Sequence, residues 1–345
     1  MRWNMAETFK TFRHLGMALD PIHVGTGGAR LGRVDLTIVR DPVTRIPKIP
    51  GSSLAGVYRA YAAMAQQARN PNRQLKGQPK PYYPDCAGQG QPDKAGKGGH
   101  CGQADCPICT VFGFARGAGG GFAGLAAFSD AHVLLFPVAT REGPVWVTCP
   151  MALGAAGVSV TDIGDDAIYR GQDGGRPLNL GWLLLPVRRL SDWQRLQSVL
   201  TSRGVLPQIC QRLGVVPDKL FAHVVNSSLE VRTSVAVDPA TGAAQEGALF
   251  SYEALPRATV LYWEVTCKNP AHFRVGSSQV VFKGEGEQVA IDDVHNVIKG
   301  AHTYLEHLGI GGMGTRGMGR LRVLCAQARA SATSGEVKDS AEPGS

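Results

Sequence analysis

The chain lacks any long apolar run. None of its apolar stretches approaches the roughly 18 residues of a membrane-spanning helix, and its N-terminal region has no apolar segment typical of a secretory signal. Hydrophobic residues make up 43% and charged residues 19% of the sequence, which are ordinary values for a globular protein. We therefore expect a cytoplasmic protein with no membrane partner.

The residue sets of common hydrolases are also missing. The sequence has no recognisable Ser/His/Asp set and no H-E-x-x-H motif. Residues 312–317 spell G-x-G-x-x-G, but the dinucleotide fingerprint needs a strand before this loop and a helix after it. Here a helical pattern precedes the loop and a short apolar strand pattern follows it, which excludes a P-loop or a Rossmann turn.

Glycine is abundant, and the segment 309–320 is rich in it. Glycine adopts positive φ and lets another backbone come close, so this run offers bare N–H groups to anionic oxygens. Arg316, Arg320 and Arg322 add positive charge to it. The segment indicates a phosphate-binding loop, and the alternative is a mobile surface linker.

The length and the charge of the chain are those of a large, basic protein. With 345 residues the chain exceeds one average domain, which favours a core domain with large insertions, or two domains. It holds 36 Lys and Arg against 28 Asp and Glu, a net charge of +8. This excess favours a polyanionic partner such as nucleic acid, although a merely basic enzyme remains an alternative.

The order of patterns predicts an α+β fold. A period-two strand at 229–237, a turn at 238–242 and a return through 248–252 predict a long hairpin. The segment 69–127 is polar and rich in glycine, which predicts an insertion rather than core, and 151–225 shows only one helix, near 193–200. Further strands are expected at 11–19, 34–39, 127–137, 145–149, 260–266 and 321–325, and helices at 54–64 and 291–308.

Four of the eight cysteines lie close together in the polar insertion. Their spacing includes the knuckle Cys106-Pro-Ile-Cys109, and thiolates with imidazole are zinc ligands. A glycine-rich insertion with few apolar residues needs such a link to fold, so we expect structural Zn²⁺; free cysteines or a redox pair are the alternatives. Cys86 and His100 compete for the fourth position in a set of Cys86, His100, Cys101, Cys106 and Cys109.

Two further features are weaker indications of a functional site. The segment 50–54 places Ser52 or Ser53 as N-cap of a helix, which is either an anion site with Arg59 two turns along or an ordinary cap. Asp35 lies in an otherwise apolar strand, and His23 precedes Gly25. A solitary Asp or His of this kind is more often structural.

Together, these segments resemble a known family. The runs 20–27, 49–54, 106–109 with Phe112-Gly113, 128–131 and the glycine segment are similar to the RAMP superfamily of CRISPR proteins. Within it the chain resembles the repeated backbone subunit of type III effector complexes. Residues 128–137, 146–150 and 247–256 favour the Cmr (III-B) branch over the Csm branch, and the likeness runs from 12 to 325.

The resemblance implies a modified RRM-like, ferredoxin-like palm with a protruding thumb hairpin and large insertions. It implies a single domain over 10–330, with a zinc-binding insertion at 69–127, a second insertion at 151–225, the thumb at 229–252 and a disordered tail at 331–345. Copies of such a subunit stack along a crRNA guide. The implied partners are target RNA, other RAMP subunits and the large subunit of the complex.

The resemblance also implies the site. Asp35 corresponds to the aspartate that supports Mg²⁺-dependent target RNA cleavage, which gives a 2′,3′-cyclic phosphate and a 5′-hydroxyl. Ala55 stands where the family often has Lys, which removes one phosphate contact, and the alternative function is a purely structural RNA-binding subunit. The implied RNA-binding residues are His23, Gly25, Thr26, Ser52, Ser53, Arg59, Arg232, Gly311, Gly312, Gly314, Thr315, Arg316, Gly317 and Arg320.

Overall fold

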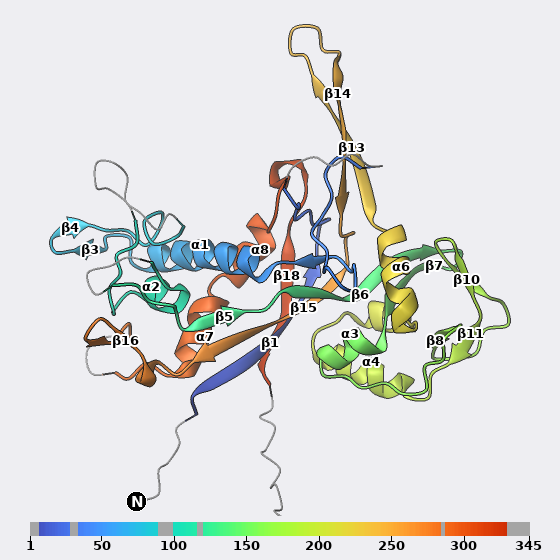
Figure 1. The fold of residues 1–345 in the computed structure, drawn as a ribbon, viewed down its shortest axis with the longest axis horizontal. Helices are drawn as coiled ribbons and strands as arrows, with labels where there is room; N and C mark the ends of the chain where they lie inside the picture. Colours follow the sequence, from blue (N-terminus) through green and yellow to red (C-terminus); the bar gives the residue numbers. More distant parts are fainter. Residues whose placement is uncertain (1–6, 28–33, 89–98, 116–119, 284–286, 330–345) are drawn as a thin grey trace, which may run out of the picture.

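The structure, a computed structural model, describes residues 7–27, 34–88, 99–115, 120–283 and 287–329. The expected tail at 331–345 lies outside these residues. Within them the fold is α+β, built on a ten-stranded sheet with the order β11-β8-β12-β7-β6-β15-β1-β18, with β2 on β6 and β5 on β15 (Figure 1). The strands are β1 (Phe9–Ala18), β2 (Lys48–Ile49), β5 (Ala126–Phe128), β6 (Ala131–Thr140), β7 (Gly143–Thr148), β8 (Ile168–Arg170), β11 (Val187–Arg189), β12 (Leu213–Val215), β15 (Val260–Lys268) and β18 (Leu321–Ala328).

Helices cover one face of the centre of this sheet. The Phe12 ring on β1 stacks on His295 of α7 at 3.7 Å, and His14 meets the edge of His302 on α8. Tyr58, fully buried on α1, also contacts His302. The elements on this side are α1 (Gly51–Arg69), α2 (Pro107–Phe112), α7 (Ile291–Lys299) and α8 (His302–Leu308) (Figure 1).

The second insertion extends the sheet beyond β7. Strand β12 pairs with β7 in parallel, and β8 lies between β12 and β11. The helix expected near 193–200 is α4, and the short strands around it gave no clear period in the sequence. The helices here are α3 (Pro150–Ala155), α4 (Trp193–Ser202), α5 (Pro207–Cys210) and α6 (Asp218–Ser227).

The expected hairpin is present and protrudes from the body (Figure 1). Strands β13 (Glu230–Val237) and β14 (Ala244–Ala254) pair antiparallel, and the turn is closed by a bond from the Gly242 N–H to the Asp238 carbonyl at 2.8 Å. We call this pair the thumb hairpin. The remaining short elements are β3 (Gln74–Leu75), β4 (Gln78–Pro79), β9 (Leu178–Leu180), β10 (Leu183–Leu185), β16 (Arg274–Val275), β17 (Ser278–Gln279), η1 (Pro270–His272) and η2 (Gly314–Arg316).

Two expected elements are each divided in the structure. The helix predicted over 291–308 is α7 and α8, and the break falls at Gly300, where a Cβ would lie 3.2 Å from the Val297 carbonyl and 3.6 Å from Ala65 on α1. The strand predicted over 127–137 is β5 and β6. Ser129 and Asp130 separate the two strands, although the Ser129 N–H still bonds the Glu264 carbonyl of β15.

Two other expectations are wrong. The segment 34–39 forms isolated bridges instead of a strand, since its hydrogen bonds alternate between the thumb hairpin and the loop that contains Gly25. The insertion 69–127 is not purely surface. Ile108 and Val111 of α2 are fully buried in the main core, because α2 packs against α1 and α7.

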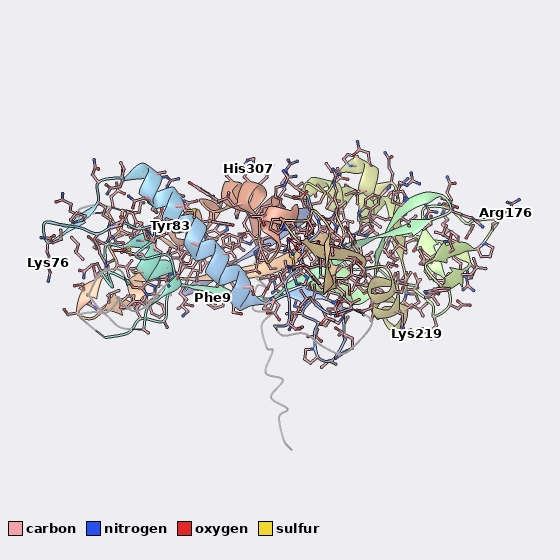
Figure 2. All side chains as sticks on the ribbon, turned by 90° about the horizontal axis from the view of Figure 1, so that it is seen from above. Phe9, Lys76, Tyr83, Arg176, Lys219 and His307 are labelled. Atoms are coloured by element: carbon pink, nitrogen blue, oxygen red, sulfur yellow. The ribbon has the colours of Figure 1, made fainter. Side chains whose placement is uncertain are left out.

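The molecule is elongated, with charged side chains at both ends. Seen from above, Lys76 and Arg176 lie at opposite ends of the long axis (Figure 2). Among the helices of the described ranges, none has both the length and the apolar composition to cross a membrane.

Candidate functional site

The segment that contains Asp35 runs along the base of the thumb hairpin. The Leu36 N–H donates to the Ser251 carbonyl at 3.1 Å, and the Glu253 N–H donates to the Leu36 carbonyl at 3.0 Å. Ser251 and Glu253 belong to β14. This pairing fixes the position of Asp35 relative to the thumb hairpin.

The Asp35 carboxylate is exposed and is held by Ser251. Its Oδ2 accepts hydrogen bonds from the Ser251 N–H at 2.7 Å and from the Ser251 hydroxyl at 2.9 Å. These bonds, the backbone one foremost, hold the pKa of the Asp35 carboxyl below its ordinary value. The group is therefore ionised at neutral pH and faces solvent.

His23 positions the glycine segment. Its Nδ1 lies 2.6 Å from the Glu253 carbonyl, and its own carbonyl accepts from the Gly312 N–H at 2.8 Å. The ring is 6% exposed and meets Tyr252 edge-on. The ring is thus buried between the thumb hairpin and the loop, and its contact with RNA stays a prediction.

The glycine segment runs from α8 to β18, as its order in the sequence predicts. Its glycines fall into two groups. At Gly311 the φ is +91°, and a Cβ would lie 2.3 Å from the His23 carbonyl, so only glycine fits there. At Gly314 and Gly317 a Cβ would meet nothing within 4 Å. The first group sets the shape of the loop, and the second leaves backbone open to a ligand.

A small apolar cluster anchors the loop to the thumb hairpin. Met318 packs with Tyr252 and Ala254, and Met313 covers them. Next to this cluster Thr315 and Arg316 are exposed, and the Arg316 guanidinium lies 5.3 Å from the centre of the Phe250 ring. The loop thus presents a cation at the thumb base.

Arg320 and Arg232 lie around Asp20. Arg320 donates to Asp20 at 3.0 Å, and this bond, followed by the charges of Arg320, Arg257 and Arg232, lowers the pKa of the Asp20 carboxyl. Arg232 itself bonds Glu230 at 2.6 Å. Both predicted arginines therefore already have an acidic partner.

The loop of Gly25 and Thr26 faces the Asp35 segment. The Thr26 N–H donates to the Thr37 carbonyl at 3.1 Å, and Gly25 and Thr26 are exposed. The structure thus brings these two residues, Asp35 and the glycine segment to one surface at the thumb base.

The start of α1 differs from the prediction. The N-cap is Pro50, without a side-chain cap bond, so neither Ser52 nor Ser53 caps the helix. The Gly51 N–H donates to Asp130 Oδ1 at 2.8 Å, and Lys48 bonds the other oxygen at 2.6 Å. The chain supplies its own carboxylate to the positive helix end, so the predicted anion site is partly filled.

Arg59 also differs from the prediction. Its guanidinium turns into the first insertion, where it donates to the carbonyls of Cys86 and Gly113, each at 2.7 Å. The side chain is half-buried beside the cysteine cluster. These bonds hold it beside the first insertion, and its contact with phosphate stays a prediction.

The four cysteines meet in one buried cluster. The Sγ atoms of Cys86, Cys101, Cys106 and Cys109 all lie within 4.8 Å of one another. The Cys101–Cys109 and Cys106–Cys86 distances are 3.6 and 4.0 Å. Four sulfurs around Zn²⁺ are about 3.8 Å apart, given Zn–S bonds of about 2.3 Å in a tetrahedron. The cluster could therefore hold a metal ion, its spacing is compatible with zinc, and the fourth residue of the group is Cys86.

His100 is not part of this ligand group. Both of its ring nitrogens are buried without a hydrogen-bond partner among the described residues, and burial, followed by the charge of Arg59, lowers its pKa to about 4. Hydrogen bonds from Cys106 and Cys109, followed by others that include Arg73, lower the pKa of the Cys101 thiol. Metal binding requires deprotonated thiols, and the Cys101 thiol is the one that Arg73 also favours as a thiolate.

Sequence reasoning missed two residues of these sites. Ser251, which holds Asp35, lies on the predicted return strand, but nothing in the sequence pairs it with residue 35. Asp130 lies in the run 128–131, where a polar pair interrupts two apolar strands. That interruption was the available signal for a capping carboxylate.

Comparison with known proteins gives the family. The model described as the RAMP superfamily matches residues 17–322. The chain belongs to the RAMP superfamily. A relative from Pyrococcus furiosus, named CRISPR system Cmr endoribonuclease Cmr4, is 25% identical over 266 residues, which cover 71% of this chain and 77% of that protein. The expected resemblance to the Cmr branch of this RAMP superfamily is confirmed.

Other relatives are more distant or match a shorter segment. A Csm3 endoribonuclease of the Cms system from Methanothermobacter thermautotrophicus is 31% identical over 106 residues, 31% of this chain and 30% of that protein. The RAMP fold is shared with a type III-B Cmr-beta structure bound to cognate target RNA (TM-score 0.55, 16% identity, 92% and 99% of the two chains). It is also shared with oligomeric Cmr4 from Pyrococcus furiosus (TM-score 0.53, 19% identity, 93% and 100%).

Proposed function

We propose that the chain is the crRNA-binding backbone subunit of a type III effector complex in the cytoplasm. Its sheet, with α1, α7 and α8 on one face, would be a modified RRM-like palm, from which the thumb hairpin extends. Several copies would stack along the guide, with other RAMP subunits and the large subunit as further partners. The names of its relatives support this: one is a Cmr endoribonuclease, and two related structures are of an oligomer and of a complex with target RNA.

The guide-binding surface would be the thumb base. Exposed backbone at Gly314 and Gly317 and the Arg316 side chain suit phosphate oxygens, and the net charge of +8 favours a polyanion. Gly25, Thr26, Gly312 and Thr315 would line the same surface. Ser52 and Ser53 at the start of α1, and Arg232 and Arg320 beside Asp20, would supply peripheral contacts.

Cleavage of target RNA would take place at Asp35, and one observation carries this: an ionised, exposed carboxylate is fixed at the base of the thumb hairpin. A nucleotide splayed out there can align its 2′-hydroxyl with the adjacent phosphate. The 2′-oxygen bonds to phosphorus as its proton leaves, the bond from phosphorus to the 5′-oxygen breaks, and that oxygen takes a proton. The products are a 2′,3′-cyclic phosphate and a 5′-hydroxyl, and Asp35 would orient the attacking hydroxyl.

Mg²⁺ would be held by Asp35 together with RNA. Among the described residues the cysteines are the only group of three or more potential metal ligands, and Asp35 belongs to no such group, so a Mg²⁺ ion here would depend on RNA for further ligands. This fits the habit of Mg²⁺ to bind through one or two carboxylates and the phosphates of a substrate. When bound, the ion would stabilise negative charge on the phosphate.

The lone carboxylate also favours a second candidate function. A subunit that only binds guide RNA would need every feature described except Asp35. In this case Asp35 would serve to fix the segment 34–38 against β14 through Ser251.

Cleavage by the assembled complex distinguishes the two functions. The complex is incubated with guide-complementary RNA and Mg²⁺, and the variant Asp35→Asn is compared with the native chain. We expect regularly spaced cuts to be lost while target binding stays within about twofold, because Asn keeps the size of the side chain and removes its charge. The matched control is Asp166→Asn, an exposed acid paired with Arg188 on the second insertion.

The outcomes separate clearly. Cuts that persist in the Asp35→Asn complex would establish the structural function. Loss of cuts together with loss of RNA binding in this variant would show that Asp35 holds the surface together instead of reacting. Loss of cuts alone, with Asp166→Asn fully active, supports the proposed cleavage site.

A further inference from the structure

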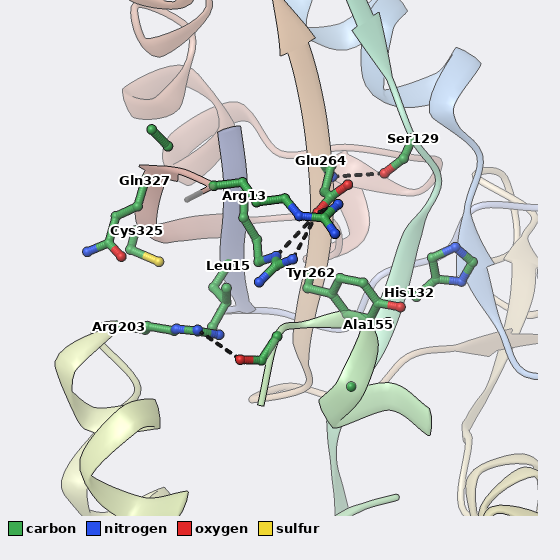
Figure 3. Close-up of a pocket in the computed structure, with 14 residues that line it drawn as sticks. Arg13, Leu15, Ser129, His132, Ala155, Arg203, Tyr262, Glu264, Cys325 and Gln327 are labelled. Carbon is green, nitrogen blue, oxygen red and sulfur yellow. Dashed lines mark hydrogen bonds and ion pairs between the residues drawn. The ribbon is translucent and has the colours of Figure 1, made fainter. Parts of the chain in front are cut away.

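A polar cavity lies on the opposite side of the sheet from α7 and α8. It has a volume of about 760 Å³ and lies between β1, β15 and β18 on one side and α3 and the end of α4 on the other. This volume is in the range of cavities that hold small organic ligands. Figure 3 shows Arg13, Arg203 and Tyr262 around this space.

Strand alternation explains which residues face this cavity. On β1 and β15, His14 and Trp263 stack on each other, and His14 also meets His295 of α7 and His302 of α8. Their neighbours Arg13, Tyr262 and Glu264 must then point to the opposite face. Each of these three lines the cavity.

The cavity carries an excess of positive charge. Arg13, Arg203 and Arg329 line it, and Glu264 is the one acid among the lining residues. Arg13 and Arg329 both reach Glu264, at 3.1 and 3.5 Å. Arg203 forms no ion pair with Glu264, the acid of this cavity. It donates at 2.5 Å to the Ala156 carbonyl, and the same carbonyl accepts from Arg13 at 2.6 Å.

Two guanidinium groups therefore converge on a single neutral oxygen. Burial, and then the charge of Arg13, lower the pKa of Arg203. The charged form of the Arg203 side chain is therefore destabilised at this position. An anion placed between Arg13 and Arg203 would relieve the repulsion and add charge-assisted hydrogen bonds.

An aromatic surface lies on the same face. The rings of Tyr262 and His132, on paired strands, are 5.6 Å apart and tilted by 32°, and both residues line the cavity. Both are half-buried, so they combine apolar surface with access from the cavity. Such rings are surfaces on which nucleic-acid bases stack.

We propose that this cavity binds a nucleotide, with its phosphate between Arg13 and Arg203 and its base against Tyr262 and His132. Arg329, whose side chain is 59% exposed, adds positive charge at the rim. The same chemistry serves a free nucleotide or one nucleotide of an RNA strand. The inference does not depend on guide binding or cleavage at the thumb base, because no residue is shared between the two sites.

Calorimetric titration of the full chain with adenosine 5′-monophosphate and with inorganic phosphate tests the site. We expect the nucleotide to bind roughly 5- to 150-fold more tightly than phosphate, as base stacking predicts. Arg203→Gln should weaken both ligands by roughly 10- to 100-fold, the effect of losing a charged hydrogen bond. Tyr262→Leu should bring the nucleotide close to the affinity of phosphate.

The matched control is Arg212→Gln. Arg212, in the second insertion, also donates to backbone carbonyls, including that of Pro144 on β7 at 2.9 Å, but does not line the cavity. Arg329→Gln is a second variant, chosen because an exposed rim residue leaves folding intact. Circular dichroism checks that every variant is folded.

The outcomes decide the proposal and the source of the nucleotide. Displacement of a fluorescent adenosine monophosphate by unphosphorylated single-stranded RNA assigns the site to a strand, and its absence assigns it to a free nucleotide. Failure of the native chain to bind the nucleotide overturns the proposal. So does unchanged affinity in both Arg203→Gln and Arg329→Gln, or selective binding of a glutamate-rich peptide in place of the nucleotide.

Discussion

The cysteine cluster and the thumb base are assembled in opposite ways. The cluster takes four side chains from one insertion and encloses them completely, so that all four cysteines are buried. The thumb base joins segments far apart in the chain: Asp35 and Ser251 are 216 positions apart, and His23 and Glu253 are 230 apart. Its reactive groups remain exposed.

This difference indicates different tasks. A closed set of ligands leaves no position for a substrate, which is typical of structural metal sites. An open surface with an ionised carboxylate, bare amides and a cation can exchange water for an anionic ligand. We therefore propose that the cluster contributes to stability and that the thumb base contributes to binding and chemistry.

Among the changes that compare these two regions, loss of a cysteine ligand is expected to have the largest effect on stability. Cys109→Ser, within α2, removes one of the four sulfurs of the cluster. The first insertion should then lose its zinc, and the free energy of unfolding of the chain should fall by about 4 kcal/mol. Zinc content by elemental analysis and urea unfolding measure the two effects. RNA binding per folded molecule should stay unchanged.

The control for this change is Cys325→Ser, a half-buried cysteine of β18 outside the cluster. It should keep the zinc content of the native chain and nearly all of its stability. Less than half an equivalent of zinc in the native chain would contradict the structural metal site. Equal unfolding curves with and without a chelator would contradict its role in folding.

Substitution of either of two glycines at the thumb base by alanine should have a smaller effect on the free energy of unfolding. Gly311→Ala forces a Cβ to within 2.3 Å of the His23 carbonyl at a φ of +91°, which should cost about 2 to 3 kcal/mol. Gly314→Ala meets nothing within 4 Å and should cost less than about 0.5 kcal/mol. Urea unfolding compares the two directly.

Equal costs at both glycines would refute the division between glycines that shape the loop and those that leave it open. A large cost for Gly314→Ala alone would reverse this division. Because both changes add one methyl group to the same loop, differences in helix propensity or net charge do not enter the comparison.

The sequence predicted local features well where one segment carries all of their residues. The cysteine spacing identified the cluster, the period of two identified β13, and the glycine run identified the loop between α8 and β18. In these cases the residues that determine the structure are neighbours along the chain.

Features that depend on pairing of distant segments were not predictable. Residues 34–39 look like a strand, yet their partners are divided between β14 and the loop of Gly25. The serines at the start of α1 look like caps, but Asp130 from another segment supplies the carboxylate. Arg59 was expected to face RNA because a helix pattern does not show which neighbour packs over it; two carbonyls of the first insertion bind it instead.

The smallest effect concerns the two arginines of the glycine segment, which the structure distinguishes. Arg320 already pairs with Asp20, whereas Arg316 has no acidic partner among the ion pairs of the described residues. A phosphate contact by Arg316 releases one counterion, so Arg316→Gln should lower the slope of log K against log salt by roughly 0.7 for single-stranded RNA. Arg320→Gln should lower it less, because binding RNA there must first break an ion pair.

Filter binding over a range of salt concentrations measures both, with Arg188→Gln on the second insertion as control. An unchanged slope for Arg316→Gln would show that the open cation at the thumb base does not contact phosphate, and the contrast between a closed cluster and an RNA-binding surface would then rest on backbone amides alone.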